Sequence, residues 1–214
     1  VALGRMGLEN KGQISAAETQ TFLSRAADVG RADAAGMLGR AMLDSRFGKR
    51  DAAGAAKWLK RAADGGDADS AYALALQEID GDGIPADLAS GIRHLKLAAD
   101  KGHAAAMADY GLMLYQGKAG AAPSKSAAAD WFAKSAKGGD AEGQFLYAYA
   151  LATGEGVARD PLQAYVWVLR SNAQGVSGAP EYDQDRSKLK GGLEKILRPD
   201  EVAKAAIEAQ KPLS

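Results

Sequence analysis

The sequence predicts an all-α solenoid (α/α superhelix) in which each repeat packs on its neighbours. The first observation is a set of glycines at intervals of 36, 36, 37 and 36 residues: Gly30, Gly66, Gly102, Gly139 and Gly175. The second is that an aromatic residue or histidine stands eight positions before each glycine. Small residues stand four and three positions before most of these glycines. A fixed period between 20 and 50 residues is typical of repeat architectures. We therefore expect about five helical-hairpin repeats over residues 1–175, the first one truncated, and capping helices over 176–214.

A leading helix is expected after each glycine. Positions five, eight, nine and twelve after the glycine share one helical face. After Gly66 these positions hold Ala71, Leu74, Ala75 and Glu78. The other repeats carry methionine or leucine at the twelfth position, so Glu78 interrupts an apolar column.

A closing helix is expected before each glycine. Ala55, Trp58, Leu59, Ala62 and Ala63 are spaced as i, i+3, i+4, i+7 and i+8, which is one face of an α-helix. The small alanines allow a neighbouring helix to approach, and the aromatic residue fills space between repeats. Recurrence of the tryptophans with the period favours a place in the core over a ligand site.

Start and turn signals agree with these hairpins. Side chains that commonly cap helix N-termini precede the expected helices; they are Ser15, Asp51, Asp87, Ser124 and Asp160. Glycine turns at 81–84 and 154–157 separate the helices of a hairpin, whereas 45–48 lacks the paired glycines. The extra residue of the 37-residue interval falls in the loop 117–123, because both flanking helices keep their register. Beyond a loop at 176–180, we expect a polar helix at 181–197 and a short helix from Pro199 to about Gln210.

Composition excludes several classes of protein. Lys+Arg and Asp+Glu both count 27, so the whole chain carries no electrostatic footprint for nucleic acid. The chain has no cysteine, which excludes disulfides, thiol nucleophiles and thiolate metal sites. No stretch of 18 apolar residues is present, so we expect no membrane span. The chain starts at Val1, partway through an expected helix, and a removed signal peptide or trimming explains this equally well. A periplasmic or secreted location is favoured over a cytoplasmic one.

The residues that could carry chemistry have simpler interpretations. His94 and His103 are the only histidines, lie on different elements and lack further ligands nearby in sequence, so we expect no metal site. His94 is expected to pack in the aromatic column, and His103 to stand at a helix start. The glycine turns follow helices rather than strands, so helix-ending glycines with positive φ explain them better than phosphate binding. Asp80 and Asp82 lie in a loop with nothing apolar to raise a pKa, and we expect no catalytic residue and no cofactor.

The segment from Gly139 to Trp167 resembles a Sel1-like repeat, and so does the frame of Ala55, Trp58, Ala62-Ala63 and Gly66. The resemblance covers about 1–175. It implies an α/α superhelix related to tetratricopeptide arrays and used for protein–protein contacts, frequently in bacterial signalling and envelope systems. It also implies that the leading helices line the concave side.

The candidate partner-binding surface is a second stripe along the leading helices. Positions three, seven, ten and fourteen after each glycine have helical spacing, and the middle of this stripe is partly apolar. The ends of the stripe are acidic or polar, so this exposed apolar strip with a polar rim suits an amphipathic helix or an extended peptide that carries Lys or Arg. The residues expected to bind are Met37, Arg40, Leu76, Asp109, Leu112, Leu146 and Tyr149.

The sequence therefore favours a monomeric, non-enzymatic scaffold or adaptor that holds a segment of another protein. Two alternatives remain open at this point. One is that the chain is a structural spacer of a larger protein. The other is that it binds a small molecule or cell-wall glycan through Tyr110, Tyr115 and Tyr147.

Overall fold

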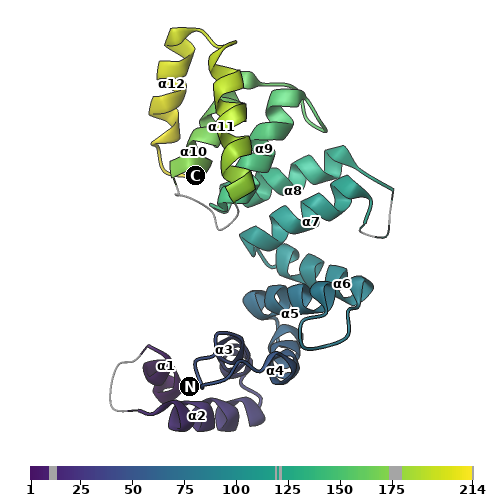
Figure 1. The fold of residues 1–214 in the computed structure, drawn as a ribbon, viewed down its shortest axis with the longest axis vertical. Coiled ribbons are helices and arrows are strands. Elements are labelled where there is room, and N and C mark those ends of the chain that lie inside the picture. Colours follow the sequence, from purple (N-terminus) through teal and green to yellow (C-terminus); the bar gives the residue numbers. More distant parts are fainter. Residues whose placement is uncertain (10–13, 119, 121, 174–179, 214) are drawn as a thin grey trace. The chain divides into compact units, whose positions relative to one another are not determined.

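The computed structural model describes residues 1–9, 14–118, 120, 122–173 and 180–213, with side chains from Asp183 onward in the last stretch. Gly175 and most of the expected loop at 176–180 lie outside these residues. Described residues form helices and no strand. The helices are α1 (Ala2–Leu8), α2 (Ala16–Asp28), α3 (Ala32–Leu43), α4 (Ala52–Asp64), α5 (Ala68–Asp80), α6 (Leu88–Asp100), α7 (Ala104–Gln116), α8 (Lys125–Lys137), α9 (Ala141–Thr153), α10 (Pro161–Ala173), α11 (Pro180–Glu194) and α12 (Pro199–Ala209) (Figure 1).

The chain divides into two compact units, Val1–His103 and Ala104–Ser214. In the first unit, α3 pairs with α4 and α5 with α6, and α4 packs on α5 to join the two hairpins. In the second unit, α7 pairs with α8 and α9 with α10, and α8 packs on α9. These repeated pairings confirm the predicted fold class of stacked helical hairpins.

The periodic glycines close their helices by a common geometry. Gly30, Gly66, Gly102 and Gly139 all have positive φ, between 86° and 94°. The next residue then donates its backbone N–H to a carbonyl five positions earlier, as in Asp67 N to Ala62 O at 3.0 Å. This is the Schellman C-cap, in which a left-handed residue lets the last turn satisfy its free carbonyls. The period of the sequence therefore marks backbone positions that favour glycine.

The predicted caps are confirmed. Ser15 forms a full capping box with Glu18, and Asp51, Asp87 and Ser124 each accept the backbone N–H three residues onward. Asp160 accepts from Gln163 N at 3.0 Å in the same way at the start of α10. Two leading helices have matching caps that were not among the predicted ones, Asp67 on α5 and Asp140 on α9.

The turn that lacks paired glycines still adopts the same backbone shape. Gly81 and Gly154 end α5 and α9 in the left-handed region, with φ of 73° and 80°. Ser45 stands at the equivalent place after α3 and has a φ of 58°. A non-glycine residue in this region costs about 1–2 kcal/mol, so the first turn carries strain that the others avoid.

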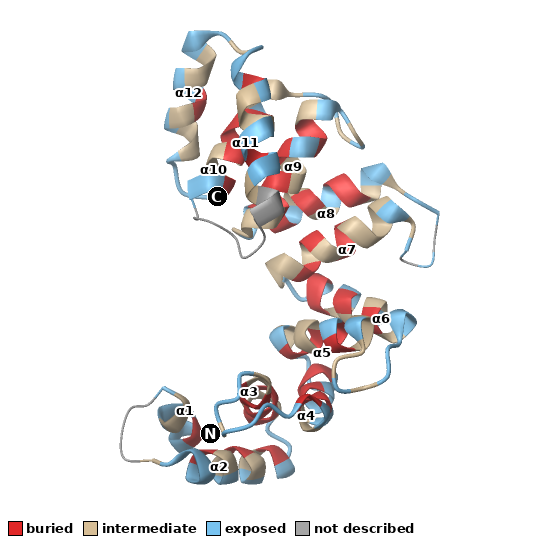
Figure 2. Ribbon diagram, viewed as in Figure 1, coloured by how far each residue is buried: buried red, intermediate tan, exposed pale blue. Residues whose placement is uncertain are grey.

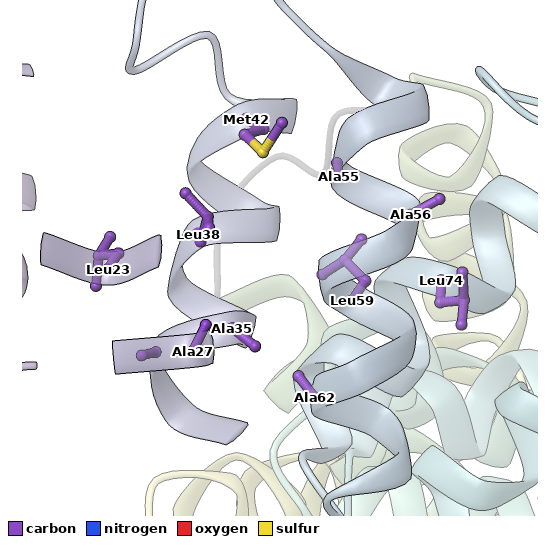
Figure 3. Close-up of a cluster of buried hydrophobic side chains, with 11 residues drawn as sticks. Leu23, Ala27, Ala35, Leu38, Met42, Ala55, Ala56, Leu59, Ala62 and Leu74 are labelled. Carbon is purple, nitrogen blue, oxygen red and sulfur yellow. The ribbon is translucent and has the colours of Figure 1, made fainter. Parts of the chain in front are cut away.

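The core of the first unit is a column of leucines framed by alanines. Leu23, Leu38, Leu59 and Leu74 come from α2, α3, α4 and α5, and all four are buried in one cluster (Figure 3). Buried residues recur on the facing sides of successive helices, and exposed residues fill the outward sides (Figure 2). Each hairpin therefore buries its apolar face against the next one.

The two sequence breaks Glu78 and His94 contact each other. Glu78 on α5 places its Oε2 2.6 Å from Nδ1 of His94 on α6, and both side chains are mostly buried. The other repeats have methionine or leucine in place of Glu78 and tryptophan or phenylalanine in place of His94. His94 is therefore a mostly buried side chain whose ring has a carboxylate partner, which was not predicted from the sequence.

This pairing predicts a non-additive double substitution. Glu78→Leu or His94→Trp alone leaves one mostly buried polar group without its partner, which costs about 1–3 kcal/mol. The double variant restores residue types found in the other repeats. We therefore expect its loss in free energy of unfolding to be smaller than the sum of the two single losses by at least about 1 kcal/mol. Urea denaturation of the four proteins followed by circular dichroism measures this coupling. Additive single effects would contradict a direct interaction.

The C-terminal helices pack on α10. Leu193 of α11 and Ala205 of α12 join the buried cluster that includes Val168. The Tyr165 hydroxyl donates to Glu194 at 2.6 Å, and burial together with this bond raises the pKa of Tyr165 to about 12. Helix α11 ends at Glu194, three residues before the expected end, and in the turn that follows Ile196 N and Leu197 N both donate to Leu193 O. The role of these helices as a terminal cap stays a prediction.

Candidate partner-binding site

A cavity of about 260 Å³ opens between α7 and α9 in the second unit, and we call it the α7–α9 pocket. Its walls are mainly apolar or aromatic. They comprise Leu112 of α7, Phe132 of α8, and Leu146, Tyr149 and Ala150 of α9. Phe132 is buried and forms the floor, whereas Tyr149 keeps 44% of its surface exposed. An apolar cavity of about 150 Å³ holds a benzene molecule, so this pocket has room for one large side chain.

Helical spacing brings these residues together. Leu146, Tyr149 and Ala150 are three and four residues apart, so they share one face of α9. Leu112 and Tyr115 are likewise three apart on α7. Gly111 lies against the Phe132 ring, where an added Cβ would come within 2.6 Å of Cε1. The glycine therefore lets α8 approach α7 closely.

One end of the pocket is polar. The Tyr115 hydroxyl donates to Glu155 Oε2 at 2.5 Å, and Lys125 Nζ lies 3.2 Å from Glu155 Oε1. The Lys125 ammonium also lies 5.6 Å from the centroid of the Tyr115 ring. The bonds from Tyr115 and Lys125 hold the pKa of Glu155 below its usual value, and the bond to Glu155 raises the pKa of Tyr115. At neutral pH this end therefore carries a carboxylate with both oxygens engaged.

Three of the seven predicted partner-binding residues, Leu112, Leu146 and Tyr149, line this pocket. Asp109 lies one turn before Leu112 on α7, is half-buried, and is not among the pocket's lining residues. It has an interaction of its own within the protein. The pocket thus gathers the apolar part of the predicted stripe in the second unit.

The predicted residues of the first unit are arranged differently. Met37 and Arg40 line a separate cavity of about 290 Å³ beside α1. Arg40 donates to Asp67 Oδ1 at 3.1 Å and to Ser70 Oγ at 3.0 Å, so it ties α3 to the start of α5. Leu76 on α5 is 37% exposed and lines neither cavity.

Sequence reasoning assigned no role at this site to Lys125 or Glu155, and named Tyr115 only for a small-molecule site. The sequence feature that could have indicated Glu155 is its place between the two glycines of the 154–157 turn. In the equivalent turn of the first unit, Asp82 pairs with Arg50 through both guanidinium nitrogens. The bond to Arg50 holds the pKa of Asp82 below its usual value, which is opposite to what a general acid needs.

Two of the three tyrosines expected at a small-molecule or glycan site pack against tryptophans instead. The rings of Tyr110 and Tyr147 pack edge-on against Trp131 and Trp167, with centroids 5.5 and 5.8 Å apart. Lys134 Nζ lies 4.1 Å from the centroid of the Trp131 ring. These tryptophans are half-buried within the hairpins, so their recurrence reflects packing.

Other kinds of site have little support among the described residues. Within them, no group of three or more His, Cys, Asp or Glu side chains could hold a metal ion. His103 stacks on Tyr72 with ring centroids 4.4 Å apart and stands just before α7. The described helices include none that is long and apolar enough to cross a membrane.

Comparison with known proteins identifies the repeat. The model of the Sel1 repeat matches residues 32–67, 68–103, 104–140 and 141–176, and each match begins at or next to a leading helix. A crystal structure of a Sel1 repeat protein from Oxalobacter formigenes superposes with a TM-score of 0.77 at 21% identity, covering 100% of this chain and 84% of the other.

A protective antigen present in uropathogenic Escherichia coli strains, which displays an SLR (Sel1-like repeat) fold, gives a TM-score of 0.64 at 20% identity. The match covers 98% of this chain and 51% of the antigen, so the chain spans about half of that protein. No curated protein sequence matches the chain. At these identities the two structures show a shared fold, and the repeat matches cover more than half of the sequence. The chain belongs to the Sel1 repeat family.

Proposed function

We propose that this protein is a non-enzymatic scaffold that holds a segment of a partner protein, and that the α7–α9 pocket receives an apolar side chain of that segment. Sel1 repeats generally mediate protein interactions, and their fold is typically a non-catalytic scaffold. Both solved relatives are bacterial proteins, which supports a role in a bacterial signalling or envelope process. In this proposal the scaffold acts as a monomer.

The observation that supports this proposal most is the convergence of Leu112, Leu146 and Tyr149 on one pocket from two neighbouring leading helices. Solvent reaches Tyr149 and the mouth of the pocket, so a partner side chain could displace water from apolar surface. Tyrosine is common among residues that dominate binding energy, because its ring is large and its hydroxyl tolerates a wet rim. The fixed Tyr115–Glu155 bond keeps one wall of the pocket in place before binding.

Substitution of two pocket residues tests the proposal. Tyr149→Ala with Leu112→Ala removes one exposed and one half-buried wall, and we expect partner affinity to fall by about 2 kcal/mol or more, which is roughly 30-fold. Pull-down from a lysate of the source organism, followed by titration with the purified partner, measures the change. Circular dichroism establishes that the variant is folded.

The matched control is Leu88→Ala with Ile207→Ala, two exposed apolar residues on α6 and α12 that do not line the pocket. It should leave affinity within about twofold of the native protein. A folded double variant of the pocket that recovers the partner as well as the native protein does would remove the pocket from the proposal.

A further inference from the structure

We infer that the α7–α9 pocket selects a partner segment in which a large apolar side chain stands close to an aspartate or glutamate that pairs with Lys125. This inference rests on the proposed function and specifies the chemistry of the partner. The two charges at the polar end of the pocket, Glu155 and Lys125, differ in how far they are already paired within the protein.

Glu155 is already paired through both of its oxygens. One of its oxygens accepts from Tyr115 and the other faces Lys125. Its side chain is 28% exposed. A cation from a partner would meet a carboxylate whose charge Lys125 already balances and would be repelled by the Lys125 ammonium, so the site disfavours lysine or arginine next to the apolar anchor.

Lys125 has unused capacity. An ammonium group has three N–H donors, and Glu155 is the one carboxylate within ion-pair distance of Lys125 among the described residues. The Lys125 side chain is 54% exposed at the mouth of the pocket. A carboxylate from a partner can therefore bind the ammonium without breaking its bond to Glu155.

The acidic residue of the equivalent turn in the first unit, Asp82, is paired with an arginine from a different repeat position, and the comparison shows why lysine matters here. Arg50 presents two guanidinium nitrogens to both oxygens of Asp82, so this fork is closed by its own carboxylate. A lysine ammonium is a compact charge whose donors point in several directions. Lys125, which stands at the repeat position of Ala52 rather than of Arg50, therefore leaves open a binding direction that the Arg50 fork closes.

The surrounding charges also favour an acidic partner. The two turns at this end of the second unit contribute three basic residues, Lys118, Lys125 and Arg159, against two acidic ones, Glu155 and Asp160. Both acidic side chains are engaged, because Asp160 caps α10 by accepting from Gln163 N. A net positive local field speeds the approach of an acidic segment and discriminates against a basic one.

Selection from a random library of 12-residue peptides displayed on phage tests the inference with the full chain as bait. We expect enriched peptides to carry Leu, Phe, Met or Trp with Asp or Glu within four residues. Synthetic copies should bind Tyr149→Ala at least tenfold more weakly than the native protein. They should bind Lys125→Met, which keeps the apolar stem, about threefold to tenfold more weakly.

The matched control is Lys188→Met, which removes an exposed lysine of α11 and should leave peptide affinity unchanged. Each other outcome overturns a defined part of the inference. Peptides weakened by Tyr149→Ala but not by Lys125→Met, or a consensus with Lys or Arg beside the anchor, would overturn the acidic preference and leave the pocket as a docking site. Peptides that bind Tyr149→Ala as tightly as the native protein, or a library without enrichment, would overturn the docking site itself.

Discussion

The Gly156→Ala substitution is expected to lower the free energy of unfolding by on the order of 4 kcal/mol, one of the largest effects of any single substitution in this chain. Gly156 has a φ of 76°, and an added Cβ would lie 2.0 Å from the Lys125 carbonyl oxygen and 2.3 Å from its carbonyl carbon. These are backbone atoms at the start of α8, so no side-chain rotation can relieve the clash. The turn would have to separate from α8, and packing between the two repeats would be lost.

Gly154→Ala is the matched control within the same turn. Gly154 also has a positive φ, 80°, but its nearest neighbour would be the Arg159 Cβ at 3.4 Å, an ordinary contact. Only the left-handed backbone penalty of about 1–2 kcal/mol is expected there. Urea denaturation measured by circular dichroism compares the two variants. Equal losses would show that the approach to Lys125 has no role in stability.

The same close approach explains why the turns carry two glycines. In the first unit, a Cβ on Gly83 would lie 2.4 Å from Ala52 Cβ and 2.8 Å from its carbonyl carbon. The first glycine of each pair, Gly81 or Gly154, ends a helix, and the second packs on the start of the preceding repeat's closing helix. A pattern that superficially resembles a phosphate loop is therefore a contact between repeats.

Much of the fold could be predicted because local rules determine it. A Schellman cap favours a residue with positive φ, so Gly66 and its equivalents are visible in the sequence as a period. An N-cap needs a short side-chain acceptor, so Asp51 and Ser124 mark helix starts directly. Both signals depend on a few neighbouring residues and on no distant contact.

The candidate site was only partly predictable, because its chemistry joins separate elements. Tyr115, Lys125 and Glu155 lie on α7, α8 and the turn after α9, and their meeting depends on how one repeat rotates against the next. The spacing along α7 and α9 did identify Leu112 and Leu146. Sequence spacing establishes a shared face within one helix, but not which residues of two helices share a cavity.

The contact between Glu78 and His94 could have been predicted from the sequence by considering the two residues together. Each residue departs from its column, and both departures fall in the same repeat. A carboxylate in an apolar column needs a buried partner, and the histidine 16 positions later supplies one. Two departures within one repeat are therefore evidence for a contact between them.

A second large effect is expected from Leu59→Ala in the core of the first unit, with a loss of about 3–5 kcal/mol. Leu59 is completely buried, and its side chain lies over Gly39 of α3, where an added Cβ would be 2.8 Å from Leu59 Cγ. Because Gly39 has no side chain to move into the space, the cavity left by the truncation should persist. Cavities that cannot collapse give the larger costs within this class of substitution.

Two further variants separate this mechanism from a general loss of apolar surface. Leu88→Ala removes a leucine that is 47% exposed on α6 and should cost less than about 0.5 kcal/mol. Gly39→Ala in the Leu59→Ala background should recover about 1 kcal/mol, because a methyl group enters the cavity and alanine favours helix. Alanine already occupies the equivalent column position at Ala75 and Ala148, so the backbone of a leading helix accepts it there. Recovery in this background, with no gain from Gly39→Ala in the native protein, would show that Leu59 and Gly39 act as one packing unit of this hairpin.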